Sequence, residues 1–431
     1  MPENASTPTS ADRETQEQSA NLFTLTGKSF FPIAFFGRLP YAMIVVGVLL
    51  LIVDARNSYA DGGLASAMVG LGAASCGPLL GALADKIGQR PVLLTMAVVN
   101  SIMLLLVVWL SYQPVDLWVL LLGAVLLGAS APQLSPMSRA RLVNLINHNM
   151  RGSQRNKTFQ RVMGYESMAD ELIFVFGPVL VGVLALALGA WSPLTLAAVV
   201  TLIFVGAFAL HPSARALVPH TTTTGSIRII QQAPARELFR FEVIILVLMM
   251  IATGAVFGST LTSLTAFMGD LGNEPGAAIL YGVLGVGSSI LAISVGFFPQ
   301  KFHLNSRLIV FSAILLLGAI PYAFVSGVEQ MVLVLILAGC GIGPVLVTIY
   351  SLGSIRGPHG RSNTIMTMLS SGIVVGQASA TASVGWLAEN HGTFSALLAV
   401  TVSAFLLFLL AVTNSVHQKF RRIEQHSPST A

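Results

Sequence analysis

Four ionisable side chains lie within long apolar stretches of the chain, away from the ends of those stretches: Arg38, Glu166, Asp170 and Glu171. An ionisable group inside a bilayer costs about 2.5–3.5 kcal/mol on insertion scales, so such groups normally face partners or water and mark functional sites. On a helix, Glu166 and Asp170 share one face, whereas Glu171 turns away from it by about 100°. We expect Arg38 and the Asp170/Glu171 pair to form a charge network.

Two adjacent carboxylates in a poorly hydrated site do not both ionise readily, so one of Asp170 and Glu171 is expected to hold a proton near neutral pH. This chemistry suits a proton-coupled carrier, and a cationic or amphipathic substrate would compete for the same carboxylates. A second interpretation stays open, in which Arg38 and Glu166 extend to the membrane interface and Asp170 only joins its helix to a neighbour.

The composition indicates what kind of fold must position these charges. Of the 431 residues, 54% are hydrophobic and 10% are charged, and the mean hydropathy is +0.78. Soluble domains carry about 25% charged residues, so this chain cannot cover the surface of a water-soluble fold. An integral membrane protein is therefore indicated. The two cysteines, Cys76 and Cys340, give neither a disulfide framework nor a pair of metal ligands.

Twelve segments are long and apolar enough to cross a bilayer, since a spanning helix needs about 20 residues. They comprise residues 31–53, 63–84, 91–111, 117–137, 163–188, 193–210, 241–268, 277–298, 308–325, 331–355, 363–387 and 394–412. With the N-terminus inside, nearly all of the 23 Lys and Arg residues fall on the cytoplasmic side, including Arg139 and Arg141 in the connection after the fourth segment. Cytoplasmic loops collect Lys and Arg, so this segregation supports twelve helices with both termini inside. The basic clusters are expected to face anionic lipid rather than nucleic acid.

A hydrophilic linker divides the predicted helices into two sets of six. We expect a disordered cytoplasmic tail over 1–30, a bundle over 31–210, a cytoplasmic linker over 211–240, a second bundle over 241–413 and a cytoplasmic tail over 414–431. Gly128 and Pro132 of the fourth segment have counterparts in Gly339 and Pro344 of the tenth, which favours an internal duplication. The predicted fold class is all-α integral membrane, with twelve transmembrane helices in two pseudo-symmetric six-helix bundles.

The connection between the second and third segments reads Gly81-Ala82-Leu83-Ala84-Asp85-Lys86-Ile87-Gly88-Gln89-Arg90-Pro91. Its Gly81, Asp85, Lys86, Gly88 and Arg90 resemble the signature loop of the major facilitator superfamily, at the place expected in a protein of six plus six helices. The resemblance covers nearly the whole chain. It implies two bundles that expose a central cavity to each side of the membrane in turn.

Asp85 stands near a helix C-terminus, where a carboxylate is unfavourable unless something compensates for it. Lys86, Arg90 or the N-terminal end of a neighbouring helix can compensate. A cluster that forms in one conformation and breaks in the other biases a two-state equilibrium, so we expect this loop to act as a gate. The alternative is a simple interfacial turn with Gly88 at its tight position.

The sequence Phe176-Gly177-Pro178-Val179-Leu180-Val181-Gly182 in the fifth segment resembles the Gly-Pro motif of proton-coupled exporters in that superfamily. The motif is incomplete, because Ile173 and Val181 replace two of its glycines. The resemblance favours export. Gly177, Pro178 and Gly182 are expected to form a kink, since Pro178 removes one backbone hydrogen bond.

Polar or aromatic side chains within apolar segments are candidates for the cavity wall. They are Tyr41, Asn100, Gln133, Tyr281, Tyr350 and Gln377. Each could instead only hydrogen-bond to a neighbouring helix.

The predicted function is secondary active transport by alternating access, with proton-coupled export of amphipathic, drug-like molecules. The alternative is a proton-coupled importer of a small solute such as a sugar or an organic acid. An enzyme is not expected, because every His lies in a loop or a tail and neither a nucleotide-binding loop nor metal-ligand spacing occurs. No cofactor, metal or nucleic acid is expected to bind. We expect a monomer in the plasma or inner membrane.

Overall fold

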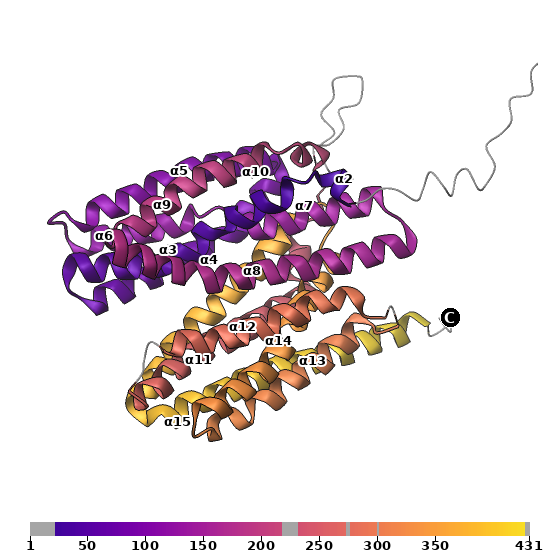
Figure 1. The fold of residues 1–431 in the computed structure, drawn as a ribbon. Coiled ribbons are helices and arrows are strands. Elements are labelled where there is room, and N and C mark those ends of the chain that lie inside the picture. Colours follow the sequence, from indigo (N-terminus) through magenta and orange to yellow (C-terminus); the bar gives the residue numbers. More distant parts are fainter. Residues whose placement is uncertain (1–21, 218–231, 273–275, 300, 427–431) are drawn as a thin grey trace, which may run out of the picture.

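The computed structural model describes residues 22–217, 232–272, 276–299 and 301–426, and these residues form helices and connections with no strand among them (Figure 1). Eleven of the described helices are long and apolar enough to cross a membrane. The last of them, α15 (Ser362–His426), turns at Gly392, whose φ of +77° lies in the left-handed region. Because each of the two lengths of α15 is long enough to span, the described chain crosses twelve times. This confirms the predicted fold class.

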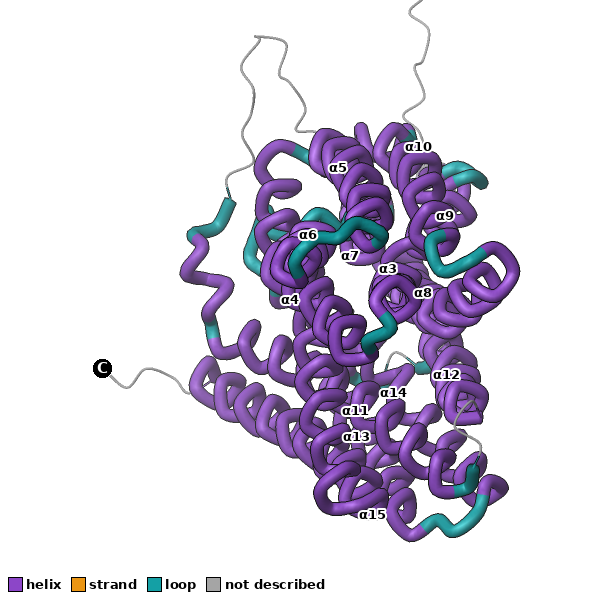
Figure 2. Tube along the Cα trace, turned by 90° about the vertical axis from the view of Figure 1, so that its left-hand side faces the viewer, coloured by secondary structure: helices purple, strands orange, loops and turns teal. Residues whose placement is uncertain are grey.

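The crossings form two bundles. The first holds α3 (Phe30–Arg56), α4 (Tyr59–Ile87), α5 (Gln89–Ser111), α6 (Leu117–Ala129) with α7 (Leu134–Asn149), α8 (Gly152–Leu188), and α9 (Ser192–Val200) continued by α10 (Gly206–Leu210). The second holds α11 (Phe241–Asp270), α12 (Gly276–Ser294), α13 (Leu304–Ala319), α14 (Val328–Arg356) and both lengths of α15. Figures 1 and 2 show the bundles as two separate groups of helices.

Both ends of the described chain lie at the same end of the bundles. The short helix α2 (Leu22–Thr26) and the last turns of α15 are both on the right in Figure 1. We call this end the termini side and the other end the opposite side. Odd-numbered crossings therefore start on the termini side, and even-numbered crossings end there.

The fourth crossing differs from the predicted segment 117–137. Helix α6 ends at Ala129, the chain is irregular over 130–133, and α7 then runs to Asn149. Pro132 explains the break, because proline has no backbone N–H and disfavours the helical conformation of the residue before it. The prediction that Arg139 and Arg141 lie in a loop is wrong, since both are buried in α7.

Asn100 of α5 holds this break in place. Its Nδ2 donates to the Leu127 carbonyl at 3.0 Å and lies 3.1 Å from Ser130 Oγ. Asn100 itself is fully buried inside the first bundle. Among its two predicted roles, the structure therefore places it in helix packing rather than on a cavity wall.

The expected tails and linker contain more helix than predicted. Leu22–Thr26 forms α2 within the expected tail 1–30, and Phe30 is fully buried at the start of α3. Helix α8 begins at Gly152 rather than at 163, and α15 continues to His426 through the expected tail 414–431. Pro212–Leu217 and Ala235–Phe239 of the linker are short 3₁₀ helices. The parts of these predictions that concern 1–21, 218–231 and 427–431 lie outside the described residues.

The far end of the linker is attached to the second bundle. The backbone N–H of Ala233 donates to the His359 carbonyl at 3.1 Å, and Arg361 Nε donates to the Ala233 carbonyl at 2.6 Å. His359 and Arg361 lie directly before α15. The linker is thus attached to the segment that leads into that helix.

The two bundles approach each other closely on the termini side. A Cβ atom added at Gly81 of α4 would lie 2.1 Å from Thr367 Oγ1 and 2.8 Å from the Asn363 carbonyl oxygen of α15. A Cβ atom added at Gly164 of α8 would lie 2.5 Å from the Ala292 carbonyl oxygen of α12. Glycine permits these approaches because it has no side chain. Gly81 is near the end of α4 and Gly164 is in the first half of α8, so both contacts lie toward the termini side.

Candidate functional site

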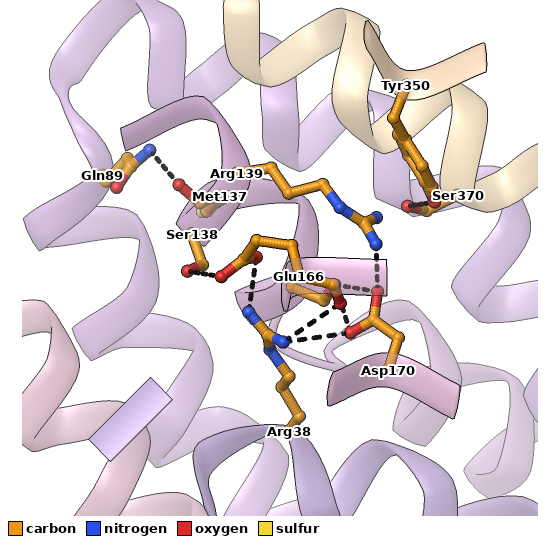
Figure 3. Close-up of polar contacts among 10 residues, drawn as sticks. Arg38, Gln89, Met137, Ser138, Arg139, Glu166, Asp170, Tyr350 and Ser370 are labelled. Carbon is orange, nitrogen blue, oxygen red and sulfur yellow. Dashed lines mark hydrogen bonds and ion pairs between the residues drawn. The ribbon is translucent and has the colours of Figure 1, made fainter. Parts of the chain in front are cut away.

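A cluster of four charged side chains lies among α3, α7 and α8 of the first bundle, next to α14 of the second bundle (Figure 3). Arg38 Nη2 is 2.5 Å from Glu166 Oε2, and Arg38 Nη1 is 3.4 Å from Asp170 Oδ1. Arg139 Nη2 is 2.6 Å from Asp170 Oδ2. The side chains of Arg38, Arg139 and Glu166 are 3%, 1% and 0% exposed, whereas that of Asp170 is 18% exposed. We call these four residues the central cluster.

Hydroxyl groups of α7 hold the two carboxylates of the central cluster. Ser135 Oγ lies 2.7 Å from both carboxylate oxygens of Asp170, and Ser138 Oγ donates to Glu166 Oε1 at 3.1 Å. Because α7 begins after the break at Pro132, its serines and Arg139 face α8 at this depth. The break in the fourth crossing therefore completes the cluster.

The second bundle also contacts the central cluster. The guanidinium carbon of Arg139 lies 3.6 Å from the centre of the Tyr350 ring of α14, a cation–π contact. The Tyr350 hydroxyl is 2.9 Å from Ser370 Oγ of α15. Tyr41 of α3 lies in the neighbourhood of Tyr350. An aromatic ring of the second bundle therefore lies beside the charges of the first.

The central cluster has more hydrogen-bond donors than acceptors. Arg38 Nε and Arg139 Nε and Nη1 are buried without a hydrogen-bond partner. The carboxylates, in contrast, receive several donors each. A cationic substrate that competed for Asp170 or Glu166 would have to displace donors from α3 and α7 that already surround these carboxylates.

Glu171 lies apart from the charge network of Arg38 and Asp170 in which it was expected, because it turns away from Asp170 by about 100° on the helix. Its Oε2 accepts a hydrogen bond from Ser289 Oγ at 3.0 Å, and its Oε1 accepts one from Ser288 Oγ. Both serines belong to α12 of the second bundle. Glu171 is 7% exposed, and none of the ion pairs formed by the described residues includes it. It is thus a buried carboxyl group between the bundles, held by neutral partners.

Arg139 is the site residue that sequence reasoning missed. It was assigned to a loop because the apolar run of the fourth segment ends near Met137. A signal was present in the spacing: Ser135 and Arg139 are four residues apart, so on a helix they share a face. Both contact Asp170 in the structure.

The loop after α4 contacts the N-terminus of α15. Asp85 Oδ1 accepts hydrogen bonds from the backbone N–H of Asn363 at 3.0 Å and from its Nδ2 at 2.9 Å. Asp85 Oδ2 accepts from the backbone N–H of Thr364 at 2.8 Å and from its Oγ1 at 2.6 Å. A carboxylate is favourable at a helix N-terminus. Of the predicted compensating groups, the structure therefore places the end of a neighbouring helix at Asp85.

The basic residues of this loop have a different position. Lys86 and Arg90 are exposed, and neither forms an ion pair with Asp85 among the described residues. Gly88 has a φ of +91°, a conformation that favours glycine and that separates α4 from α5. Gln89 Nε2 donates to Asn363 Oδ1 at 2.6 Å, which adds a second contact between this loop and α15.

Helix α8, in which Gly177, Pro178 and Gly182 are expected to form a kink, is continuous from Gly152 to Leu188. A Cβ atom at Gly177 would lie 2.7 Å from Ala42 Cβ, so Gly177 allows α8 to pack on α3. A Cβ atom at Gly182 would meet no atom within 4 Å.

The remaining cavity candidates fall into two groups. Tyr350 lies at the central cluster with Tyr41 in its neighbourhood, and Tyr281 of α12 lies near Glu171. Gln133 is buried and donates to the Ala131 carbonyl at 3.3 Å, within the break of the fourth crossing. The backbone of Gln377 packs against Gly258 of α11 inside the second bundle.

Twelve membrane crossings in two bundles, with a buried charge cluster where the bundles face each other, define a polytopic membrane transporter. The chain belongs to the Major Facilitator Superfamily, whose sequence model matches residues 30–371. Members of this family are secondary transporters of small molecules in the lipid bilayer and are not enzymes. The predicted family is therefore confirmed. A search of curated protein sequences found no match.

Solved structures with the same fold support this assignment. A bacterial homologue of the iron transporter ferroportin, in an outward-facing state with soaked iron, has a TM-score of 0.67 and 15% identity, covering 90% of this chain and 98% of that chain. The human organic anion transporter MFSD10 has a TM-score of 0.65 and 15% identity, covering 90% and 99%. The E. coli fucose:proton symporter FucP has a TM-score of 0.61 and 14% identity, covering 89% and 98%. At these identities the similarity concerns the fold.

Proposed function

We propose that the protein is a proton-coupled secondary active transporter and that the structure corresponds to its outward-facing state. The contacts between the bundles that involve Gly81, Asp85 and Gly164 lie toward the termini side. Lys86, Arg90 and Arg155 lie on that side, as expected for the cytoplasmic face of a cell membrane. With the cytoplasmic side closed, a substrate would reach the central cluster from outside.

The buried, neutral environment of Glu171 is the main support for proton coupling. Burial in a medium of low dielectric constant disfavours a carboxylate, and the partners of Glu171 are the neutral hydroxyls of Ser288 and Ser289. The charged or titratable groups near it are Asp170 of its own helix, Arg139 of α7 and Tyr281 of α12. A neutral Glu171 fits the closed seam between α8 and α12. An ionised Glu171 requires water, and therefore favours separation of these helices.

Two directions of transport have support from particular residues. The sequence Gly177-Pro178 on α8 resembles that of exporters, which favours proton-coupled export of amphipathic molecules. Uptake of a small organic acid is the second candidate, because the unpartnered N–H groups of Arg38 and Arg139 suit a ligand rich in acceptor oxygens. In both cases one copy of the chain contains the whole site.

The test is flux in liposomes with an imposed pH gradient of either sign, measured for lipophilic cations, amphipathic anions and small metabolites. We expect Glu171→Gln to reduce the dependence of flux on pH, because the amide cannot exchange a proton. Glu389→Gln, an exposed carboxylate near the end of the eleventh crossing, is the matched control and should behave as the wild type. If Glu171→Gln and Asp170→Asn both keep the pH dependence, the proton-coupling assignment is wrong.

A further inference from the structure

We propose that the substrate of the central cluster carries an anionic group, and that this group takes the place of the Asp170 carboxylate on Arg139. The inference rests on the proposed transport function and names the polar part of the substrate. The anions in question are carboxylates, sulfonates or phosphates attached to a flat or apolar body.

The first argument is that several buried guanidinium N–H groups have no hydrogen-bond acceptor. Each guanidinium has five N–H donors, yet Arg139 Nε and Nη1 and Arg38 Nε have no partner although they are buried. The oxygens of the cluster already accept bonds from Arg38, Ser135, Ser138 and Arg139. The central cluster therefore lacks acceptors, which an anionic ligand supplies through strong charge-assisted hydrogen bonds.

The exposure of Asp170 is the second argument. It is 18% exposed, whereas the other three members of the cluster are exposed by 3% or less. Glu166 is fixed by Arg38 and Ser138 on its buried side. Asp170 is thus the carboxylate of the cluster that is least enclosed and that can most readily move away from its arginine. It occupies the position on Arg139 that the anionic group of a substrate would take.

The aromatic surroundings are the third argument. Tyr350 of the second bundle lies against the guanidinium of Arg139 at 3.6 Å, and Tyr41 of the first bundle lies in the neighbourhood of Tyr350. An anion on Arg139 would bring its attached body against the Tyr350 ring, where flat and apolar groups pack well. Because Arg139 and Tyr350 belong to different bundles, the bound molecule would contact both.

Charge balance links this anion to a proton. Two arginines and two carboxylates sum to zero, so an added anion leaves the cluster with one negative charge that a proton on Asp170 cancels. The charged or titratable groups near Asp170 are Arg38 of α3, Arg139 of α7, Tyr350 of α14, and Tyr165, Glu166 and Glu171 of its own helix. Anion and proton then bind together, which is the coupling required for uptake by symport.

Three probes of similar size test the charge of the ligand: p-toluenesulfonate, the neutral p-toluenesulfonamide and the cation benzyltrimethylammonium. The readout is the melting temperature of the purified full-length protein in detergent, measured between about pH 6 and pH 8. We expect stabilisation by the sulfonate alone. Its apparent affinity should fall by up to about tenfold for each unit of rising pH, because binding takes up one proton.

Variants of the central cluster test the roles of Asp170 and Arg139 separately. Asp170→Asn should bind the sulfonate more tightly and without the pH dependence, because the competing carboxylate is gone. The double variant Arg139→Gln/Asp170→Asn keeps the charge balance, so it should fold and yet lose binding. Arg155→Gln, at the exposed start of α8, should bind like the wild type.

Stabilisation by the ammonium or the sulfonamide in place of the sulfonate would overturn the proposal, as would the absence of binding by all three probes. Sulfonate binding that persists in the double variant would also overturn it. A protein that binds the sulfonate as expected but shows no proton-coupled flux in liposomes would instead contradict the proposed function, and the anion site would stand.

Discussion

Arg139 and Arg141 are two residues apart on α7 and have opposite surroundings. Arg139 pairs with a carboxylate, whereas Arg141 Nε donates to Gln89 Oε1 at 2.9 Å and its Nη1 donates to the Phe208 carbonyl at 2.9 Å. The Phe208 ring lies 3.9 Å from the Arg141 guanidinium carbon. Burial, together with the charge of Arg141, holds the pKa of His211 below its usual value, so His211 is neutral at pH 7. Arg141 thus belongs to packing on the termini side, and only Arg139 belongs to the central cluster.

The ion pair between Arg38 and Glu166 provides a prediction about stability. Glu166→Gln should destabilise the protein by about 3–5 kcal/mol, because it removes a buried carboxylate from a buried guanidinium. Arg38→Met combined with Glu166→Leu should cost much less, since neither charge is left behind. Unfolding in detergent, followed by tryptophan fluorescence, measures both. Equal losses in the single and the double variant would show that the pair is not coupled in this way.

Sequence reasoning identified part of the central cluster from the residues alone. Arg38 and Asp170 are at similar depths in their segments, and the structure brings them within 3.4 Å. The departure of Glu171 from this pair follows from helix geometry. Its partners Ser288 and Ser289 could not be inferred, because they are small, polar and about 120 residues away, and their position depends on how the bundles meet.

At the scale of the elements, close contacts between backbones determine where the bundles touch. Gly81 of α4 lies against α15, and Gly164 of α8 lies against α12. The twelve crossings were predictable, because each is an apolar run of sufficient length. The extension of α7 to Asn149 was not, because its buried polar side chains find their partners on α5, α8 and α10.

Gly81→Ala tests the contact between α4 and α15. The new methyl group would lie 2.1 Å from Thr367 Oγ1 and 2.8 Å from a backbone oxygen, so the termini side should no longer close fully. We expect a larger fraction of protein that is open on the termini side, measured as faster labelling of cysteines placed at the ends of α4 and α15 on that side. Gly182→Ala, where the methyl group meets no atom within 4 Å, is the control. Unchanged labelling of Gly81→Ala would contradict the proposed seam.

At the scale of the whole molecule, the contact of Asp85 with Asn363 and Thr364 joins the two halves of the chain through residues that are nearly 280 positions apart. The sequence placed this loop correctly between the second and third crossings and suggested a helix end as one partner. Which helix supplies that end depends on the packing of the two bundles, and therefore it could not be derived from local patterns.

Asp85→Asn should shift the protein toward the inward-facing state. The amide keeps part of the hydrogen bonding but loses the charge that the N-terminus of α15 favours, a contribution of about 0.3–2 kcal/mol. Distances between spin labels at the ends of the two bundles on the termini side should therefore lengthen in a larger share of molecules. Asp116→Asn, at the start of α6 on the opposite side, should leave this distribution unchanged. A wild-type distribution in Asp85→Asn would contradict the role of this loop as a gate.

The attachment of Ala233 to His359 and Arg361 has a consequence for how the protein can be assembled. Ala233, near the end of the linker, is bound by residues of the second bundle. These residues directly precede the N-terminus of α15, which contacts Asp85. Two separate polypeptides, divided within 218–231, would each carry a complete set of six crossings. Two such half-proteins, co-expressed from separate mRNAs, should associate in the membrane and form a functional transporter.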